Sequence, residues 1–385
     1  MLRPISRILF LTTVFALLAF TAKASAQKYI TFDVAGGGTG NWQGTFVWGT
    51  NFWGAVDGPY IDSNYTYHGY VRAPGGKVTT FDVPGAGTGA YQGTVPQGIN
   101  MWGAITGQYY NGNVSHGFLR TADGTITTFD VKGAGSSGTT YTGTNNIGAW
   151  ASEYQGTYPE AINDLGEIAG YYVDANWVWH GFVRAPNGKI STFDVKGAGA
   201  GPGQGTYVNY TCPATNNAGV LAGMYMDAND VRHGYIRTRD GKITTFDVPG
   251  AGTAPLEGTI PSSINLEGEV SGIMADNINW HGFVRSPDGK TTTIYDAPGN
   301  PYGTTTVGED INYFGVAMGQ VNDVNGVWHG YFRTPDGTLT VFDVPGAGTS
   351  LFQGTYAESI NMEGVIVGHY WDTNFVGHGF LRLPK

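Results

Sequence analysis

Histidine and aspartate recur along the chain in a pattern that could serve metal binding or proton transfer. A His-Gly-(Phe/Tyr)-x-Arg segment occurs seven times, and each copy is matched by a Phe-Asp-Val-like segment that carries an acid. The first segments begin at His68, His116, His180, His233, His281, His329 and His378, and the second at Phe32, Phe81, Phe129, Phe193, Phe246, Tyr295 and Phe342. Residues that recur in every copy of a repeat are expected to hold the repeat together. We therefore interpret the histidines as hydrogen-bonding a turn and the acids as accepting backbone N–H bonds, and we predict no metal site from them.

Three glutamates could do different chemistry because they do not recur in every copy. Glu160, Glu309 and Glu358 occupy one position of the repeat, which holds Trp48, Gln97 and Ser262 in other copies. If the copies form a ring, these side chains face its central channel. Carboxylates around one axis could bind a cation or act as an acid/base pair, although a water-filled polar channel needs no such role. His369 is the only His outside the repeated segment, and its position varies so freely between copies that we expect it to face solvent.

Aromatic residues form a third candidate group. They cluster in and after Asp/Asn-rich turns, and the turns sit on the rim that differs most between copies. The residues are Tyr65, Tyr67, Trp177, Trp179, Trp280, Trp328, Trp371 and Phe375. Exposed rings on a polar surface suit stacking against sugars or contact with a protein partner. The alternative is that the rings pack between neighbouring copies.

The Asp/Asn-rich turns themselves could offer oxygen ligands to calcium. Asx turns use the same residues without any ion, and the longer acidic loop of a calcium-binding hand is missing. We expect no cofactor, with calcium at a turn as the weaker alternative.

The elements that position these groups follow from the repeat. The histidines lie about 48 residues apart over much of the chain, a period typical of repeat architectures. Each copy contains four short segments rich in β-branched and aromatic residues, separated by turns. An Asn-x-x-Gly turn recurs at Asn51, Asn100, Asn163, Asn265, Asn312 and Asn361, and the fourth copy shortens it to Asn217-Ala218-Gly219.

Four antiparallel strands per copy predict an all-β, seven-bladed β-propeller. A parallel β-helix is the rival, but its coils are shorter and lack three tight hairpins each. The mature sequence opens with a fourth strand and closes with a third, so we expect residues 27–34 to form the outer strand of the last blade and close the ring. Residues 27–385 are then a single domain, with approximate blades at 35–83, 84–131, 132–195, 196–248, 249–297, 298–344 and 345–385. Extra residues near Tyr141 to Tyr154 and around Cys212 are interpreted as surface loops.

The N-terminus predicts export. Residues 1–26 combine Arg3 and Arg7, an apolar stretch and an Ala-Ser-Ala cleavage site, as signal peptides do. Removing them takes away three basic residues and no acid, so the net charge of −10 becomes −13. This charge argues against nucleic acid and anionic lipid as partners. We expect a secreted or periplasmic protein with no membrane insertion after cleavage, and its single Cys212 cannot form an internal disulfide.

The repeat resembles the extracellular repeats of the HAF family, named for a His-Ala-Phe signature. Here the signature is a variant, His-Gly-Phe or His-Gly-Tyr, flanked by Ile-Asn-x-x-Gly-x-Ile-x-Gly and Thr-Thr-Phe-Asp-Val-Pro-Gly. The resemblance covers essentially the whole mature chain. It implies exported, propeller-like proteins without a defined shared activity, and no catalytic residues come with it.

Several enzyme signatures are missing from the sequence, among them Gly-x-Ser-x-Gly, His-Glu-x-x-His, a phosphate loop and the sialidase Asp box. The leading hypothesis is therefore a binding or scaffold module for a glycan or a cell-surface or matrix protein. The alternative is a polysaccharide lyase or hydrolase that uses Glu160, Glu309 and Glu358, and a passive envelope component is a third. The sequence leaves the oligomeric state open.

Overall fold

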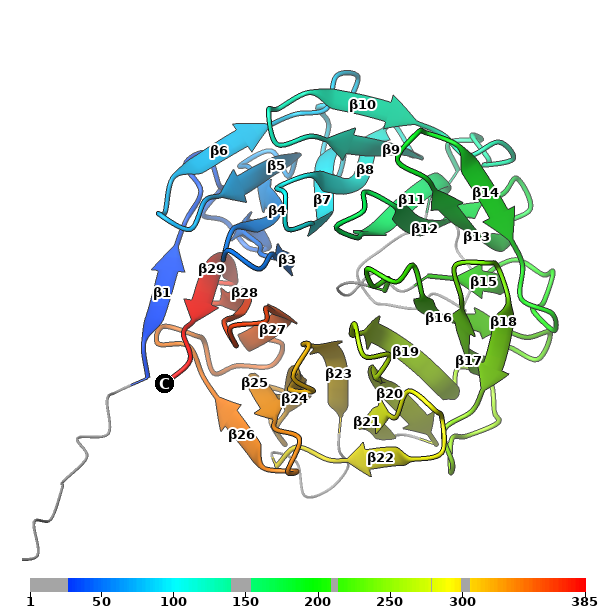
Figure 1. Ribbon diagram of the computed structural model, residues 1–385. Coiled ribbons are helices and arrows are strands. Elements are labelled where there is room, and N and C mark those ends of the chain that lie inside the picture. Colours follow the sequence, from blue (N-terminus) through cyan, green and yellow to red (C-terminus); the bar gives the residue numbers. More distant parts are fainter. Residues whose placement is uncertain (1–26, 140–153, 209–213, 278, 299–304) are drawn as a thin grey trace, which may run out of the picture.

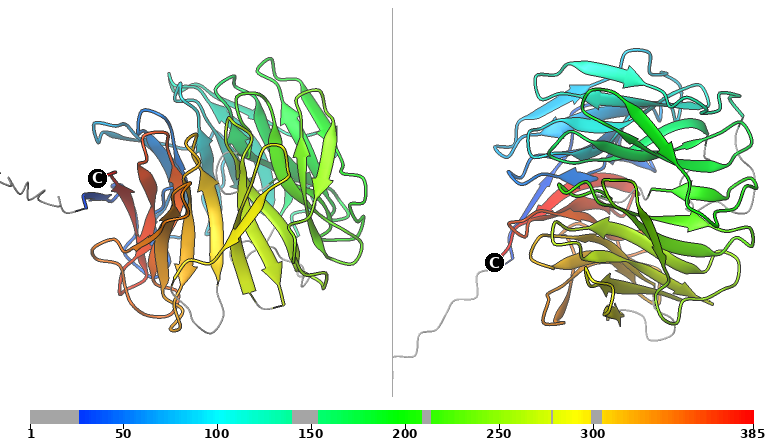
Figure 2. Two further views of the ribbon diagram at one scale, coloured as in Figure 1. Left: turned by 60° about the horizontal axis from the view of Figure 1, so that its bottom comes forward. Right: turned by 45° about the vertical axis from the view of Figure 1, so that its right-hand side comes forward.

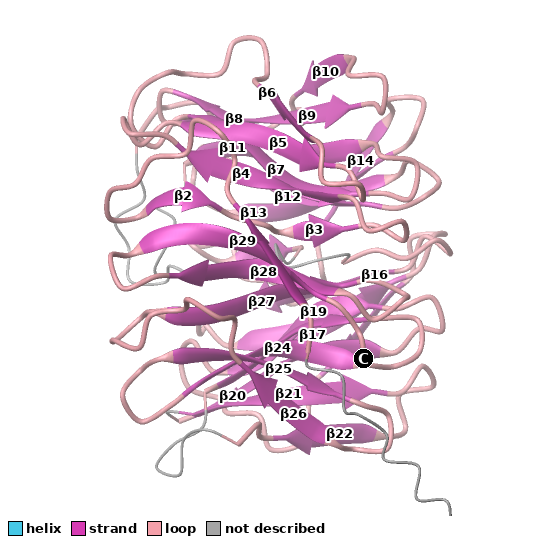
Figure 3. Cartoon of the chain, turned by 90° about the vertical axis from the view of Figure 1, so that its left-hand side faces the viewer, coloured by secondary structure: helices cyan, strands magenta, loops and turns pink. Residues whose placement is uncertain are grey.

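The computed structural model describes residues 27–139, 154–208, 214–277, 279–298 and 305–385. Every regular element in these ranges is a β-strand, which confirms the prediction of an all-β protein. The strands form a nearly closed, propeller-like ring around a central axis (Figure 1). Two further views show the sheets standing side by side around the ring (Figure 2). Seen edge-on, the strands cross the ring and their loops gather at two opposite rims (Figure 3).

Consecutive strands pair antiparallel in ladders that repeat along the chain. The first ladders are β2 (Gln43–Thr45) with β3 (Gly49–Thr50), β4 (Val56–Ile61), β5 (Tyr67–Arg72), β6 (Val78–Phe81); β7 (Gly93–Ile99), β8 (Ile105–Asn111), β9 (Val114–Arg120), β10 (Ile126–Phe129); and β11 (Gln155–Ile162), β12 (Ile168–Val173), β13 (Trp179–Arg184), β14 (Ile190–Phe193). The next are β15 (Gly205–Tyr207), β16 (Leu221–Met226), β17 (Arg232–Arg237), β18 (Ile243–Phe246); β19 (Gly258–Ile264), β20 (Val270–Asp276), β21 (Asn279–Arg285), β22 (Thr292–Tyr295); and β23 (Thr306–Ile311), β24 (Ala317–Asn322), β25 (Trp328–Arg333), β26 (Leu339–Phe342).

The last ladder joins the two ends of the sequence. It contains β27 (Gly354–Ile360), β28 (Ile366–Trp371), β29 (Val376–Arg382) and, from the N-terminal end, β1 (Tyr29–Phe32). β1 runs antiparallel to β29 in the register Tyr29↔Arg382 to Phe32↔Gly379, and the two lie side by side in Figure 1. This is the pairing that the complementary ends of the repeat predict. It covers an edge that β29 would otherwise expose.

Glycine lets neighbouring ladders approach each other closely. Gly93, at the start of β7, pairs in parallel with Tyr67 of the preceding ladder and has a φ of +115°. A Cβ atom on Gly93 would lie 2.0 Å from the Tyr67 carbonyl oxygen, far inside van der Waals contact. Glycine is therefore required by both its dihedral angle and its surroundings. Gly44, Gly156, Gly205, Gly258 and Gly354 repeat this arrangement.

A closed circle of asparagines links the turns between first and second strands. Each Asn side chain donates its amide N–H to the carbonyl oxygen of the next Asn, from Asn51 to Asn100 at 3.1 Å and finally from Asn361 back to Asn51 at 3.3 Å. The members between them are Asn163, Asn216, Asn265 and Asn312. Each Oδ1 also accepts N–H groups of its own turn, as Asn100 does from Trp102 and Ala104. The prediction of a shortened fourth turn at Asn217 was wrong, because Asn216 opens a full turn closed by Gly219.

Aromatic and cationic side chains fill the space between ladders. The Arg of each His-Gly segment lies over an aromatic ring of the preceding ladder, as Arg72 does over Phe32 at 5.0 Å and Arg120 over Phe81 at 4.9 Å. The Gly of the same segment leaves room for a ring of its own ladder, since a Cβ on Gly69 would meet Phe81 at 2.8 Å. The repeated His-Gly-(Phe/Tyr)-x-Arg and Phe-Asp-Val-like segments thus stabilise the packing of one ladder against the next.

Candidate functional site

The repeated histidines and acids bind each other. In all seven copies the His Nδ1 lies 2.7–3.1 Å from the acid of the Phe-Asp-Val-like segment, as in His68–Asp82 and His378–Asp33. The hydrogen bond to Asp194 raises the pKa of His180. The acids were expected to accept backbone N–H bonds, but the structure pairs them with imidazoles instead. Because the geometry is the same in every copy, we interpret the His–Asp pair as structural: it links the third strand of a ladder to the end of the outermost strand.

The calcium alternative concerns the Asp/Asn-rich turns. In the first of them Asp62 Oδ1 accepts the backbone N–H groups of Asn64 and Thr66, both at 2.8 Å, which is an Asx turn. Among the described residues, no group of three or more His, Cys, Asp and Glu side chains is arranged to hold a metal ion. The expectation of no cofactor stays a prediction, with calcium at a turn as its alternative.

The candidate channel residues all lie where the innermost strand is interrupted. Glu160, Glu309 and Glu358 each occupy a register shift between the first and second strands, as do Gln97 and Ser262. Trp48 lies in the break between β2 and β3. A β-bulge leaves one residue out of the ladder and redirects its side chain, and bulges are frequent beside active sites.

Two of the three glutamates come together. Glu309 of β23 and Glu358 of β27 are electrostatic neighbours, and burial together with the Glu309 charge raises the pKa of Glu358. Gln320 Nε2 donates to Glu309 Oε1 at 3.0 Å. Glu160 comes from β11, which lies across the ring from β27 (Figure 1). Glu309 and Glu358 are therefore the pair of carboxylates for which the structure shows an interaction.

His369 joins this pair. Its Nδ1 lies 3.6 Å from Glu358 Oε1, and its ring stacks on Tyr356 with the centroids 5.1 Å apart. The expectation that it faces solvent was wrong, because only 7% of the residue is exposed. Burial lowers the pKa of His369 to about 3, which keeps the imidazole neutral near pH 7. A neutral imidazole beside a carboxyl with a raised pKa is a combination that can accept and donate a proton.

The aromatic residues expected on the variable rim are mostly packed. Trp179 and Trp371 are only 1% and 4% exposed, so their ring faces are not presented to solvent. The other six are partly buried against the clusters between ladders; they are Tyr65, Tyr67, Trp177, Trp280, Trp328 and Phe375. Burial raises the pKa of Tyr67 to about 12. For most of this set the structure shows the packing that was the alternative interpretation, and ligand binding by them stays a prediction.

More exposed aromatic residues stand on the same rim, in the crossings between ladders. Tyr91 is 54% exposed and Phe352 is 51% exposed. The backbone N–H of Tyr91 donates to Tyr65 O at 2.7 Å, and that of Phe352 donates to Gly326 O at 2.9 Å. Each crossing is thus tied to the turn of the preceding ladder. We call Trp42, Tyr65, Tyr91, Trp177, Phe352 and Phe375 the crossing rim.

All six residues of the crossing rim have left-handed backbone conformations. Their φ angles run from 57° at Phe375 to 66° at Trp177. Glycine adopts this conformation without strain, and other copies use it at the aligned positions Gly203 and Gly326. A bulky residue with positive φ is a genuine outlier. The aligned sequence signal, an aromatic residue where sister copies carry Gly, could have revealed these positions.

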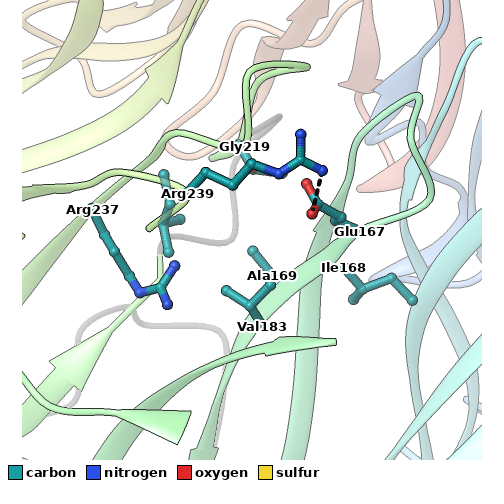
Figure 4. Close-up of a pocket in the computed structure, with 9 residues that line it drawn as sticks. Glu167, Ile168, Ala169, Val183, Gly219, Arg237 and Arg239 are labelled. Carbon is teal, nitrogen blue, oxygen red and sulfur yellow. Dashed lines mark hydrogen bonds and ion pairs between the residues drawn. The ribbon is translucent and has the colours of Figure 1, made fainter. Parts of the chain in front are cut away.

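One cavity lies between the third and fourth ladders on the opposite rim (Figure 4). Arg239 and Glu167 form an ion pair of 2.9 Å at its edge. Its volume of about 30 Å³ has room for water but is far below the roughly 300 Å³ that a small-molecule pocket occupies. This cavity is not a ligand site.

Three features predicted from the sequence lie outside the described residues. They are the signal peptide, most of the insertion near Tyr141 to Tyr154, and Cys212. Within the described ranges no helix is long and apolar enough to span a membrane.

Comparison with solved structures supports the propeller-like fold. Virginiamycin B lyase from Staphylococcus aureus, in a catalytically inactive form with quinupristin, superposes with a TM-score of 0.55 at 13% identity, covering 93% of this chain and 99% of that chain. A streptogramin B lyase gives 0.54 at 12% identity, covering 92% and 97%. The β-propeller domain of the trilobed protease from Pyrococcus furiosus, described as having an open velcro topology, gives 0.54 at 9% identity, covering 89% and 94%. These likenesses show the fold alone. In this chain β1 pairs with β29.

No protein-family model and no curated protein sequence matches the chain.

Proposed function

We propose that this chain is an exported seven-bladed propeller with four strands per blade, and that it acts as a binding or scaffold module. Its ligand is a glycan or a cell-surface or matrix protein, and its place is outside the cytoplasm, secreted or periplasmic. The HAF-like repeat and residues 1–26 support export. The successive ladders and the β1–β29 pairing support the blade count.

The observation that carries a binding role is the strained crossing rim. A left-handed bulky residue costs on the order of 1–3 kcal/mol and persists only where the structure enforces it. Since Gly203 and Gly326 serve the same backbone positions, the backbone conformation does not require an aromatic residue there. Rigid aromatic side chains held at the surface suit sugar faces and protein hot spots. Such strain is expected where the side chain has a role in function.

The test uses glycine, which removes the ring and relieves the strain together. Tyr91→Gly and Phe352→Gly should keep or raise the thermal unfolding midpoint and abolish binding on glycan arrays and in pull-downs with defined surface proteins. Ile294→Ala, at an exposed outer-strand position, is the control and should bind as the parent does. Unchanged binding in both glycine variants would refute the rim assignment. Trp179→Ala is unsuitable because Trp179 is buried and its loss would disturb the core.

A second candidate function, a polysaccharide lyase or hydrolase, draws on the Glu309, Glu358 and His369 group. The neutral, buried His369 next to Glu358 is the observation that favours it. Among the similar folds, one lyase is described as inactive when a histidine is replaced by alanine, but fold likeness does not transfer that role to His369. Release of reducing or unsaturated ends from acidic and neutral polysaccharides, lost in Glu358→Gln, would favour this function.

A further inference from the structure

Exposed apolar side chains encircle the rim opposite the crossing rim. They occupy the two middle positions of the Asn-x-x-Gly turns. Trp53 is 61% exposed, Trp102 64%, Leu165 47%, Leu266 49%, Phe314 61% and Met362 40%. We call these six residues the turn ring. Trp53 and Trp102 take the same place in successive turns, and the other described tryptophans are buried or partly buried.

The turn does not need these side chains. Its third position holds Trp53, Trp102, Leu165 and Phe314 in four copies, but Ala218, Glu267 and Glu363 in the others. Hydrogen bonds of the Asn and the Gly close the turn in every copy, with or without an apolar residue. Exposed apolar side chains that gather on one rim, and that the turns do not need, are characteristic of an interaction site.

The turn ring is held rigidly. The circle of Asn hydrogen bonds fixes each turn to the next. Trp102 Nε1 donates to Asp164 O at 2.9 Å, and the N–H of Met101 donates to Asp164 Oδ1 at 2.8 Å. The polar edge of the Trp102 indole is thus anchored while its residue remains largely exposed. A preorganised surface loses little conformational entropy on binding.

The negative charge of these turns indicates which kind of partner they can bind. The middle positions hold three acids, Asp164, Glu267 and Glu363, and no Lys or Arg. A second copy of this chain that docked turn ring against turn ring would oppose acids to acids, and an anionic lipid surface would be repelled by these acids as well. Arginine and lysine side chains, in contrast, pair with carboxylates and stack on indole faces.

We propose that the turn ring is a second interaction surface, which docks a partner polypeptide segment that combines Lys or Arg with apolar side chains. The inference is independent of the function proposed for the crossing rim. It assigns the two faces of the ring to different contacts, which is the arrangement of a scaffold.

The experiment measures binding of a labelled peptide that alternates Lys and Leu, by fluorescence polarisation on the exported protein. We expect saturable binding that weakens at high salt and falls roughly tenfold or more in Trp53→Ala/Trp102→Ala. Glu267→Gln/Glu363→Gln should weaken binding and reduce its salt dependence. Ile294→Ala should bind as the parent does, and unchanged thermal midpoints show that the variants fold.

Peptides that alternate Glu with Leu, or Lys with Ser, separate charge from apolar contact and should bind weakly. No binding of the Lys/Leu peptide, or equal binding by the tryptophan variant, overturns the proposal. Dimerisation that the tryptophan variant abolishes would make a second copy the occupant, and binding to neutral vesicles would make it a lipid surface; either overturns the cationic partner. Tyr91→Gly should bind the peptide normally, so failure here and failure of the crossing rim are distinguishable.

Discussion

Asp57 is an acidic residue at a position of the repeat that is uncharged in the other copies. Its side chain is fully buried in β4, and among the described residues no other residue forms a hydrogen bond with either carboxyl oxygen. The aligned residues in other ladders, Thr106, Ser271 and Val367 among them, carry no charge. Burial raises the pKa of Asp57 from 3.8 to about 8. The folded protein therefore holds this carboxyl protonated at neutral pH.

Stability should fall as pH rises because of this group. Between pH 4 and 8 the unfolded chain has released the Asp57 proton while the folded chain retains it, so rising pH favours unfolding, and the effect levels off above about pH 8. Asp57→Val, which copies Val367, removes the dependence. As the pH rises from 4 to 8, the unfolding free energy of the variant should increase relative to that of the parent, by on the order of 5 kcal/mol in total. Denaturant titrations at several pH values measure it, and a difference that is independent of pH would contradict the burial argument.

The site residues show what could be predicted one residue at a time. The position of Glu160, Glu309 and Glu358 was predictable because the copies align, but their separation was not, since it depends on where each ladder stands around the ring. His369 was misjudged because variation between copies was equated with exposure. Tyr91 and Phe352 of the crossing rim were not predicted as site residues, because the amino-acid sequence does not report backbone φ angles. The one sequence signal was an aromatic residue at positions where an aligned copy has Gly.

In the Asn-x-x-Gly turns, one Asn side chain has two tasks: it stabilises its own turn and it links that turn to the next ladder. Asn100 Oδ1 organises its own turn, while Asn100 Nδ2 reaches Asn163 O of the next ladder. The sequence predicts the first task, because Asn opens such turns. It does not reveal the second, which links residues far apart in the chain.

Asn100→Asp separates the two tasks. The carboxylate can still accept the N–H bonds of its turn, but it cannot donate to Asn163 O and places a charge beside that carbonyl. We expect a loss of about 1–3 kcal/mol of unfolding free energy, measured by denaturant titration above about pH 6. Asn187→Asp is the matched control, because Asn187 is exposed and aligned hairpins carry Asp288 and Asp336. Equal stability of both variants would show that the circle contributes nothing.

The whole molecule is joined by contacts that repeat from ladder to ladder. Parallel pairing at Gly93 and its counterparts, Arg–aromatic contacts and the Asn circle all pass from one ladder to the next. Fold class was predictable from such repetition because each copy reports the same pattern. The pairing of His with Asp between neighbouring strands was not, although both motifs were visible, because the strand register that brings them together is a property of the folded sheet.

Cross-linking of the two chain ends tests the closed ring most directly. Ile30 and Leu381 face each other in the β1–β29 ladder, and Cys212 is the single cysteine in the sequence. In a Cys212→Ser background, Ile30→Cys and Leu381→Cys should be joined within one molecule by a short bifunctional thiol reagent. The circular product should migrate faster than the linear chain on a denaturing gel, and only when the protein is cross-linked folded. Absence of that product, with both thiols reactive, would contradict the closed ring.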